Sequence, residues 1–151
     1  MNELLDIMKK QWLAIGFAGT LACLFALPAL AQTGSVQKEI NTAHAHAVMA
    51  QSADTVKMSH THLHHVINCL AGPDGKAFDP NAANPCKGQG NGAIPDSQGN
   101  ADLQGKLQSA LADAKSGLQA DSLKAIHQNA AEAAGALKAA SAQKSSGDSS
   151  W

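Results

Sequence analysis

The stretch LQSALADAKSGLQADSLKAIHQNAAEAAGALKAA, Leu107 to Ala140, decides the fold of this chain. In it and in the residues just before it, apolar side chains recur every three or four positions, as on one face of an α-helix. Gly117 interrupts the pattern and Asp121 can cap a new helix, so residues 101–142 are predicted to form two helices. Their core stripes comprise Leu103, Leu107, Leu111, Ala114 and Leu118 in the first helix, and Leu123, Ile126, Ala130, Ala133 and Leu137 in the second.

The segment 35–70 also has the composition of helices. A single rod of this length would span roughly 54 Å, which is long for so small a domain. Asp54 can cap a second helix, with Ser52 as the other candidate, so we expect helices at about 36–51 and 55–70 joined by a tight turn. No segment shows the alternation of a β-strand. The sequence therefore predicts an all-α fold, a small four-helix bundle.

The loop between the two pairs of helices, residues 71–100, contains six glycines and four prolines. Loops this long are usually functional or disordered. Cys69 ends the second helix and Cys86 lies in the middle of the loop. In an oxidising compartment two such cysteines usually pair, and closing a chain segment of this size is worth about 3 kcal/mol. We therefore expect a disulfide that pins the loop to the bundle.

The first 31 residues resemble a secretory signal peptide rather than part of the fold. Two lysines, Lys9 and Lys10, precede a long apolar run that ends in Ala29-Leu30-Ala31, a typical cleavage pattern. The expected organisation is a signal peptide at 1–31, a helical domain at 32–142 and a disordered tail at 143–151. The protein is then periplasmic or secreted, with no membrane attachment after cleavage. Retention of the apolar run as an anchor is the alternative.

Composition disfavours several functions. After residue 31 the chain has nine lysines, no arginine and ten acidic residues, so it lacks the basic surface of a nucleic-acid-binding protein. Phe78 and Trp151 are the only aromatic residues there, which disfavours a stacking platform for bases or sugars. The sequence shows no nucleophile elbow and no phosphate-binding loop in a strand–helix context. We therefore expect a protein that is not an enzyme.

The distribution of histidine suggests a binding function instead, since six of the seven histidines lie between residues 44 and 65. On a helical wheel of MSHTHLHHVINCL (Met58 to Leu70), His60 and His64 lie at the apolar face made by Val56, Leu63, Ile67 and Leu70. His62 and His65 share the opposite stripe with Met58 and Cys69.

Each pair has chelating spacing, but a closed metal site usually needs three or four ligands. The missing ligands could come from His44 and His46 on the first helix, or from His127 on the last. Imidazole suits copper, zinc and nickel, and the thioethers of Met49 and Met58 favour copper(I). The structural alternatives are a core histidine at position 60, solvated histidines at 62 and 65, and methionines that only pack.

Two segments also carry a resemblance to a known family. Both LQSALADAKSGLQADSLKAIHQNAAEAAGALKAA and AHAHAVMAQSADTVKMSHTHLHHV, Ala43 to Val66, resemble the small periplasmic metal-binding proteins, which are histidine-rich four-helix bundles. The resemblance implies uptake of divalent metals, copper especially. It points to these matching histidines: His44, His46, His60, His64 and His127. Unlike that family, this chain has one histidine in its last two helices and carries the loop rich in proline and glycine.

The leading functional prediction is an exported protein that buffers, transports or senses copper, zinc or nickel. Neutral imidazoles would be the ligands, so binding should weaken as the pH falls through about 6.5. Two alternatives remain open at this point. One is a non-catalytic interaction or stress protein that uses loop 71–100 for recognition, and the other is a bundle that binds haem non-covalently.

Overall fold

The computed structural model describes the backbone of residues 33–143 and the side chains of residues 36–143. The predicted signal peptide lies outside the described residues, and so does nearly all of the predicted tail. The described helices are, in chain order, α2 (Thr33–Ser52), α3 (Val56–Ala71), the short α4 (Ala93–Asp96), α5 (Ala101–Gln119) and α6 (Leu123–Ser141). The prediction of an all-α fold with four main helices packed as a bundle is confirmed.

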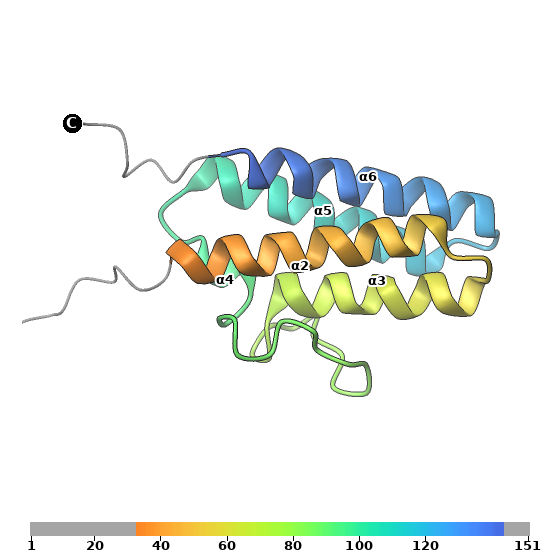
Figure 1. Ribbon diagram of the computed structural model, residues 1–151, viewed down its shortest axis with the longest axis horizontal. Coiled ribbons are helices and arrows are strands. Elements are labelled where there is room, and N and C mark those ends of the chain that lie inside the picture. The colour runs from red at the N-terminus through yellow and green to blue at the C-terminus, as the bar shows by residue number, and fades with distance from the viewer. Residues whose placement is uncertain (1–32, 144–151) are drawn as a thin grey trace, which may run out of the picture.

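The four long helices form two antiparallel hairpins that lie side by side. Helix α2 packs on α3 and on α6, and α5 packs on α6 and on α3, so the helices form a closed ring. Both hairpin turns lie at one end of the bundle, and the first and last described helices begin and end at the other (Figure 1). Within the described residues, no helix is long and apolar enough to cross a membrane.

Side-chain caps set where the helices begin, and two of them differ from the prediction. Helix α3 is capped by Thr55, whose hydroxyl accepts a hydrogen bond from the Met58 amide, rather than by Asp54 or Ser52. Helix α6 is capped by Ser122 rather than by Asp121. In both cases the capping residue lies immediately before the helix, where its oxygen reaches the free amide at the third helical position.

The core consists of a few large side chains among many alanines. Each long helix contributes at least one fully buried leucine or isoleucine, and the set is Ile40, Leu63, Leu70, Leu107, Ile126 and Leu137. Alanine occupies the other contact positions. Because its side chain is small, the helix backbones can approach closely. Val56, which the wheel placed on the core face, is instead 42% exposed, because it is the first residue of α3 and extends past the packed part of the bundle.

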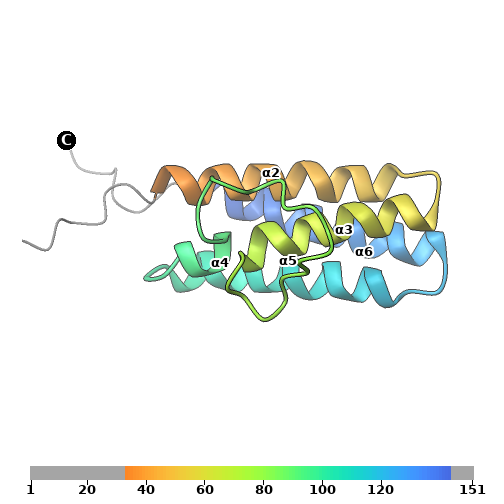
Figure 2. The same ribbon diagram turned by 90° about the horizontal axis from the view of Figure 1, so that it is seen from below.

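The loop after α3 is an ordered structure fixed to the bundle. The predicted disulfide between Cys69 and Cys86 is present, with the two Cα atoms 5.2 Å apart. Beside it, the buried amide of Asn68 donates to the Asp79 carbonyl at 3.0 Å and accepts from the Asp79 amide at 2.8 Å. The loop folds back over α2 and α3 (Figure 2), and it contains the short helix α4, which the sequence did not predict.

Two glycines close the base of this loop. Gly72 (φ +69°) follows α3 and Gly92 (φ +115°) precedes α4, and the backbone is so close there that a Cβ on Gly72 would lie 1.5 Å from the Asn91 carbonyl oxygen. Only glycine fits both the conformation and the space.

Candidate metal centre

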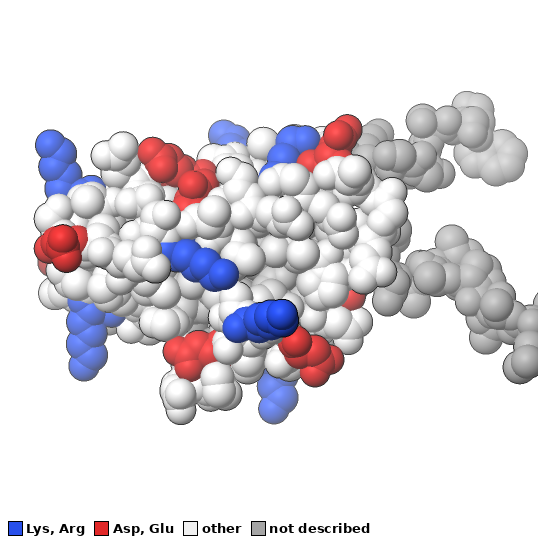
Figure 3. Space-filling model, turned by 180° about the vertical axis from the view of Figure 1, so that it is seen from behind, with Lys and Arg blue, Asp and Glu red and all other residues white. Residues whose placement is uncertain are grey.

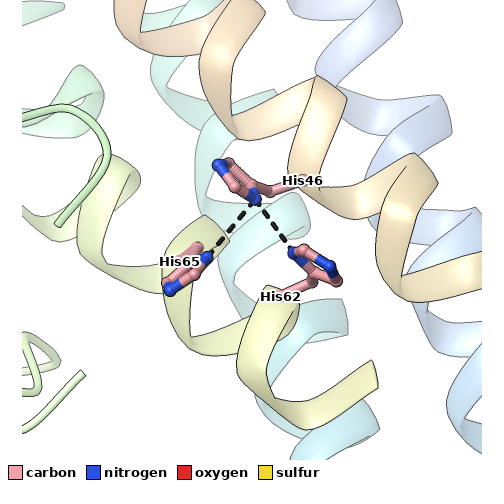
Figure 4. Close-up of side chains that lie close together, drawn as sticks. All are labelled: His46, His62 and His65. Carbon is pink, nitrogen blue, oxygen red and sulfur yellow. Dashed lines mark hydrogen bonds between the residues drawn. The ribbon is translucent and has the colours of Figure 1, made fainter. Parts of the chain in front are cut away.

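Three of the predicted histidines meet on one flank of the α2–α3 hairpin. His62 and His65 lie on successive turns of α3, three residues apart, and His46 faces them from α2 (Figure 4). The register between the helices is fixed one turn away, where the buried Ser59 hydroxyl donates to the Ala50 carbonyl at 2.7 Å. The cluster therefore depends on how the two helices pack as well as on spacing within α3.

The distances within the cluster match those of a metal site. The Nδ1 atom of His46 lies 3.1 Å from Nδ1 of His62 and 3.3 Å from Nδ1 of His65. One ligand atom from each ring can be chosen so that all three lie within 4.8 Å of one another. In a tetrahedral centre with metal–nitrogen distances of about 2.0–2.1 Å, ligand nitrogens lie about 3.3–3.4 Å apart. The two short distances are thus close to the edges of such a tetrahedron.

The rings are also oriented for ligation. Figure 4 shows the second nitrogen of each ring, Nε2, pointing away from the point where the three Nδ1 atoms approach. A neutral imidazole carries one proton, so ligation through Nδ1 places that proton on the outward Nε2. Within residues 36–143 no protein group accepts a hydrogen bond from these three Nε2 atoms. All three side chains are half-buried, so solvent and ions can reach the cluster.

Two of the cluster histidines, His46 and His65, favour the neutral form that binds metal. The pKa of His46 is lowered to about 4, mainly by burial and in smaller part by the neighbouring His65 and His62. Burial also lowers the pKa of His65, with smaller contributions from His62 and His64. Both shifts disfavour the imidazolium form, because burial removes water from the charge and a neighbouring imidazolium would repel it. His46 and His65 therefore stay unprotonated to a lower pH than an ordinary histidine.

The remaining predicted site residues lie elsewhere. His64 faces the loop, where its Nδ1 lies 3.2 Å from Oδ2 of Asp79. His127 on α6 forms a hydrogen bond through Nε2 with the Ala53 carbonyl at 2.9 Å, which joins α6 to the α2–α3 turn. His44 and His60 are half-buried outside the three-histidine group. The Nε2 atom of His60 is buried and has no hydrogen-bond partner in the described part of the chain.

The wheel placed His62 and His65 on the side of α3 opposite the apolar face, and the structure shows what lies there. Helix α3 has α5 on one side and α2 on the other, so this stripe adjoins α2 rather than facing only water. A helical wheel read with a single buried face does not describe a helix that packs against neighbours on two sides. Met58, on the same stripe, is 50% exposed.

One buried acidic group was not anticipated. Glu39 is fully buried in α2, where its Oε1 accepts a hydrogen bond from the Gly92 amide at 2.8 Å and its Oε2 has no partner among the described residues. The pKa of this carboxyl is raised to about 7, mainly by desolvation; the Gly92 hydrogen bond opposes the shift and the neighbouring Asp96 adds to it. The available signal was a glutamate three residues after Val36 and four before Ala43, at a core position of the helix.

One surface groove lies away from the histidine cluster. It has a volume of about 500 Å³ and lies between the loop and α5, with residues such as Ala77, Ile94 and Leu111 in its wall. None of the three clustered histidines lines it. On the face of the molecule shown in Figure 3, lysines and acidic residues are interspersed, with neither sign forming a continuous patch.

Comparison with known proteins adds no assignment. No protein-family model, no curated protein and no solved structure matches this chain. The bundle and a histidine cluster, which the resemblance in the sequence implied, are both present, but membership of the small periplasmic metal-binding proteins is not shown.

Proposed function

We propose that this is an exported, non-catalytic protein that binds a transition metal ion, copper, zinc or nickel, through His46, His62 and His65. The observation that carries the proposal is the convergence of ring nitrogens from two helices: Nδ1 of His46 lies 3.1 Å and 3.3 Å from Nδ1 of His62 and His65, which is close to the ligand spacing of a tetrahedral metal. Imidazole nitrogen is a good ligand for all three metals, and calcium or magnesium would need oxygen ligands.

The same features favour reversible binding over a structural metal. A structural site is usually closed by four protein ligands, whereas this cluster offers three and leaves a coordination position open. Its rings are half-buried, and their Nε2 atoms have no partner among the described residues to hold them rigidly. Such ligands can release the ion to another acceptor, which suits buffering, transport or sensing.

Export is supported by two independent features of the chain. The first is the apolar run ending at Ala31, which has the pattern of a signal peptide. The second is the Cys69–Cys86 disulfide, because such bonds persist mainly outside the reducing cytosol.

The test is calorimetric titration of the purified protein with Zn²⁺ and Cu²⁺ at neutral pH, using His46→Ala and a matched control, His44→Ala. Both positions are half-buried histidines on α2, two residues apart, but His46 alone belongs to the cluster. We expect His46→Ala to weaken binding at least about tenfold, because it removes one of three ligands, and His44→Ala to leave it unchanged. Equal loss in both variants, or no binding by the unmodified protein, would refute the proposal.

A further inference from the structure

Two methionines extend the histidine cluster toward the tip of the α2–α3 hairpin. Among the described side chains, the exposed large hydrophobic residues are Val48, Met49, Val56 and Met58, all within eleven residues of one another around the turn. Met49 is 45% exposed and Met58 is 50% exposed. At this exposure each thioether is accessible to an ion from solvent.

The register of the hairpin places both thioethers beside the cluster. Met49 follows His46 by three residues and Met58 precedes His62 by four, so each lies one helical turn from a cluster histidine on the same flank. The contact between Ser59 and Ala50 lies between the levels of the two methionines, because α2 and α3 run in opposite directions, and it separates them along the hairpin axis by only two residue rises, about 3 Å.

The directions of the side chains support this placement. Helical side chains lean toward the N-terminus of their own helix, so Met49 leans back toward His46. On α3 the same rule tilts His62 over the turn that carries Met58. Met49 therefore leans toward the three-histidine group, and Met58 lies next to the group on the side of the hairpin tip.

The chemistry of the thioether selects the ion. Sulfur in methionine is a soft, neutral ligand that favours copper(I), whereas zinc is well served by imidazole alone. Unlike imidazole, a thioether has no proton to lose, so its binding of copper(I) does not depend on pH in the range where histidine titrates.

We propose that Met49 and Met58 form an entry site for copper(I) at the hairpin tip, from which the ion passes to the three histidines. The transfer is an exchange of ligands, sulfur for nitrogen, and copper remains in the +1 state throughout. The second step rests on the proposed function of the histidine cluster, whereas the binding of copper(I) by the two thioethers does not.

The experiment compares two metals in one double variant, Met49→Leu with Met58→Leu, which keeps the apolar surface and removes the sulfur. Copper(I) affinity is measured anaerobically by competition with a coloured chelator, and Zn²⁺ affinity by calorimetry. We expect copper(I) binding to weaken about tenfold or more while Zn²⁺ binding changes less than about twofold. X-ray absorption of the copper(I)-loaded unmodified protein should show sulfur ligands that the variant lacks.

The control is Val48→Ala with Val56→Ala, which trims the same apolar surface and leaves both sulfurs, and it should preserve copper(I) affinity. Unchanged copper(I) affinity in the methionine variant, or an equal loss of Zn²⁺ binding, would overturn the entry site and leave the proposed function intact. If instead the unmodified protein binds copper(I) through sulfur but no Zn²⁺ at all, the entry site stands and the proposed function fails.

Discussion

The two flanks of α3 carry the same residue type at similar spacing and yet do different things. On the flank toward α2, His62 and His65 meet a third histidine, His46, and the three nitrogens converge. On the flank toward the loop, His64 meets the carboxylate of Asp79. The difference lies in what the neighbouring element presents, because an imidazole becomes a ligand only where others point at the same place.

The largest expected effect is on Zn²⁺ affinity, when histidines are removed from one flank of α3 or from the other. The double variant His62→Ala with His65→Ala leaves a single cluster imidazole, and we expect it to lose at least about a hundredfold in Zn²⁺ affinity. His60→Ala with His64→Ala removes as many histidines from the other flank and should cost no more than about threefold. Calorimetric titration of both variants with Zn²⁺ measures the two affinities. Equal losses of affinity would show that the two flanks of α3 do not differ in metal binding.

Removal of the disulfide should disturb the loop flank and spare the other. In Cys69→Ala with Cys86→Ala, the cross-link over 17 residues is lost, and the free energy of unfolding should fall by about 3 kcal/mol. Chemical denaturation measures this loss. Zn²⁺ affinity should be retained at temperatures where the variant is folded, because His46, His62 and His65 are fixed by the α2–α3 packing. A parallel loss of affinity would show that the loop positions the cluster.

The buried Glu39 should make the attachment of the loop depend on pH. The folded-state pKa of this carboxyl is raised from 4.5 to about 7, so the folded protein holds a proton that the unfolded chain releases. This contribution to stability is complete below pH 4.5 and declines as the pH rises to about 7, by up to about 3 kcal/mol.

Glu39→Gln tests that dependence. The amide can still accept from Gly92 but does not titrate, so the variant should be more stable than the unmodified protein at neutral pH and should lose the decline. Denaturation across the acidic range would show this. If the free energy of unfolding of Glu39→Gln declined by the same amount as the pH rises, the pH dependence would belong to other groups.

The smallest effect is expected at the ion pair of the loop flank. His64 and Asp79 are each about one-third exposed, so their attraction is screened and Asp79→Asn should cost less than about 1 kcal/mol. The hydrogen bonds between Asn68 and the backbone of Asp79 remain in this variant. The Zn²⁺ affinity of this variant should equal that of the unmodified protein. A clear loss of affinity would show that Asp79 contributes to metal binding.

Much of the fold could be predicted because it follows from local patterns. The apolar periodicity of residues 101–142 predicted α5 and α6, and the two cysteines predicted the disulfide that is present. The caps were misplaced by one residue at Ser122, since several neighbouring residues offered a capping oxygen and the sequence does not say which one reaches a free amide. Helix α4 was missed because a single turn of helix has no periodicity to detect.

The candidate site was predictable only in part. Histidine clustering and the spacing of His62 and His65 identified α3 as a carrier of ligands, but the choice of His46 over His44 depends on the rotation of α2 against α3. That rotation is set by contacts far apart in the sequence, such as the one between Ser59 and Ala50. The resemblance to known metal-binding bundles pointed to His44, His60, His64 and His127 as well, and the structure places these four outside the cluster.

The sequence by itself determined that this chain forms amphipathic helices, that two cysteines are available to pair, and that one helix carries histidines at chelating spacing. These properties depend on residues within a few positions of one another. The tertiary structure alone decided which imidazoles converge, which one meets a carboxylate, and that a glutamate is sealed into the core. Those outcomes depend on how helices rotate and pack against each other, a balance of many weak contacts that no short stretch of sequence contains.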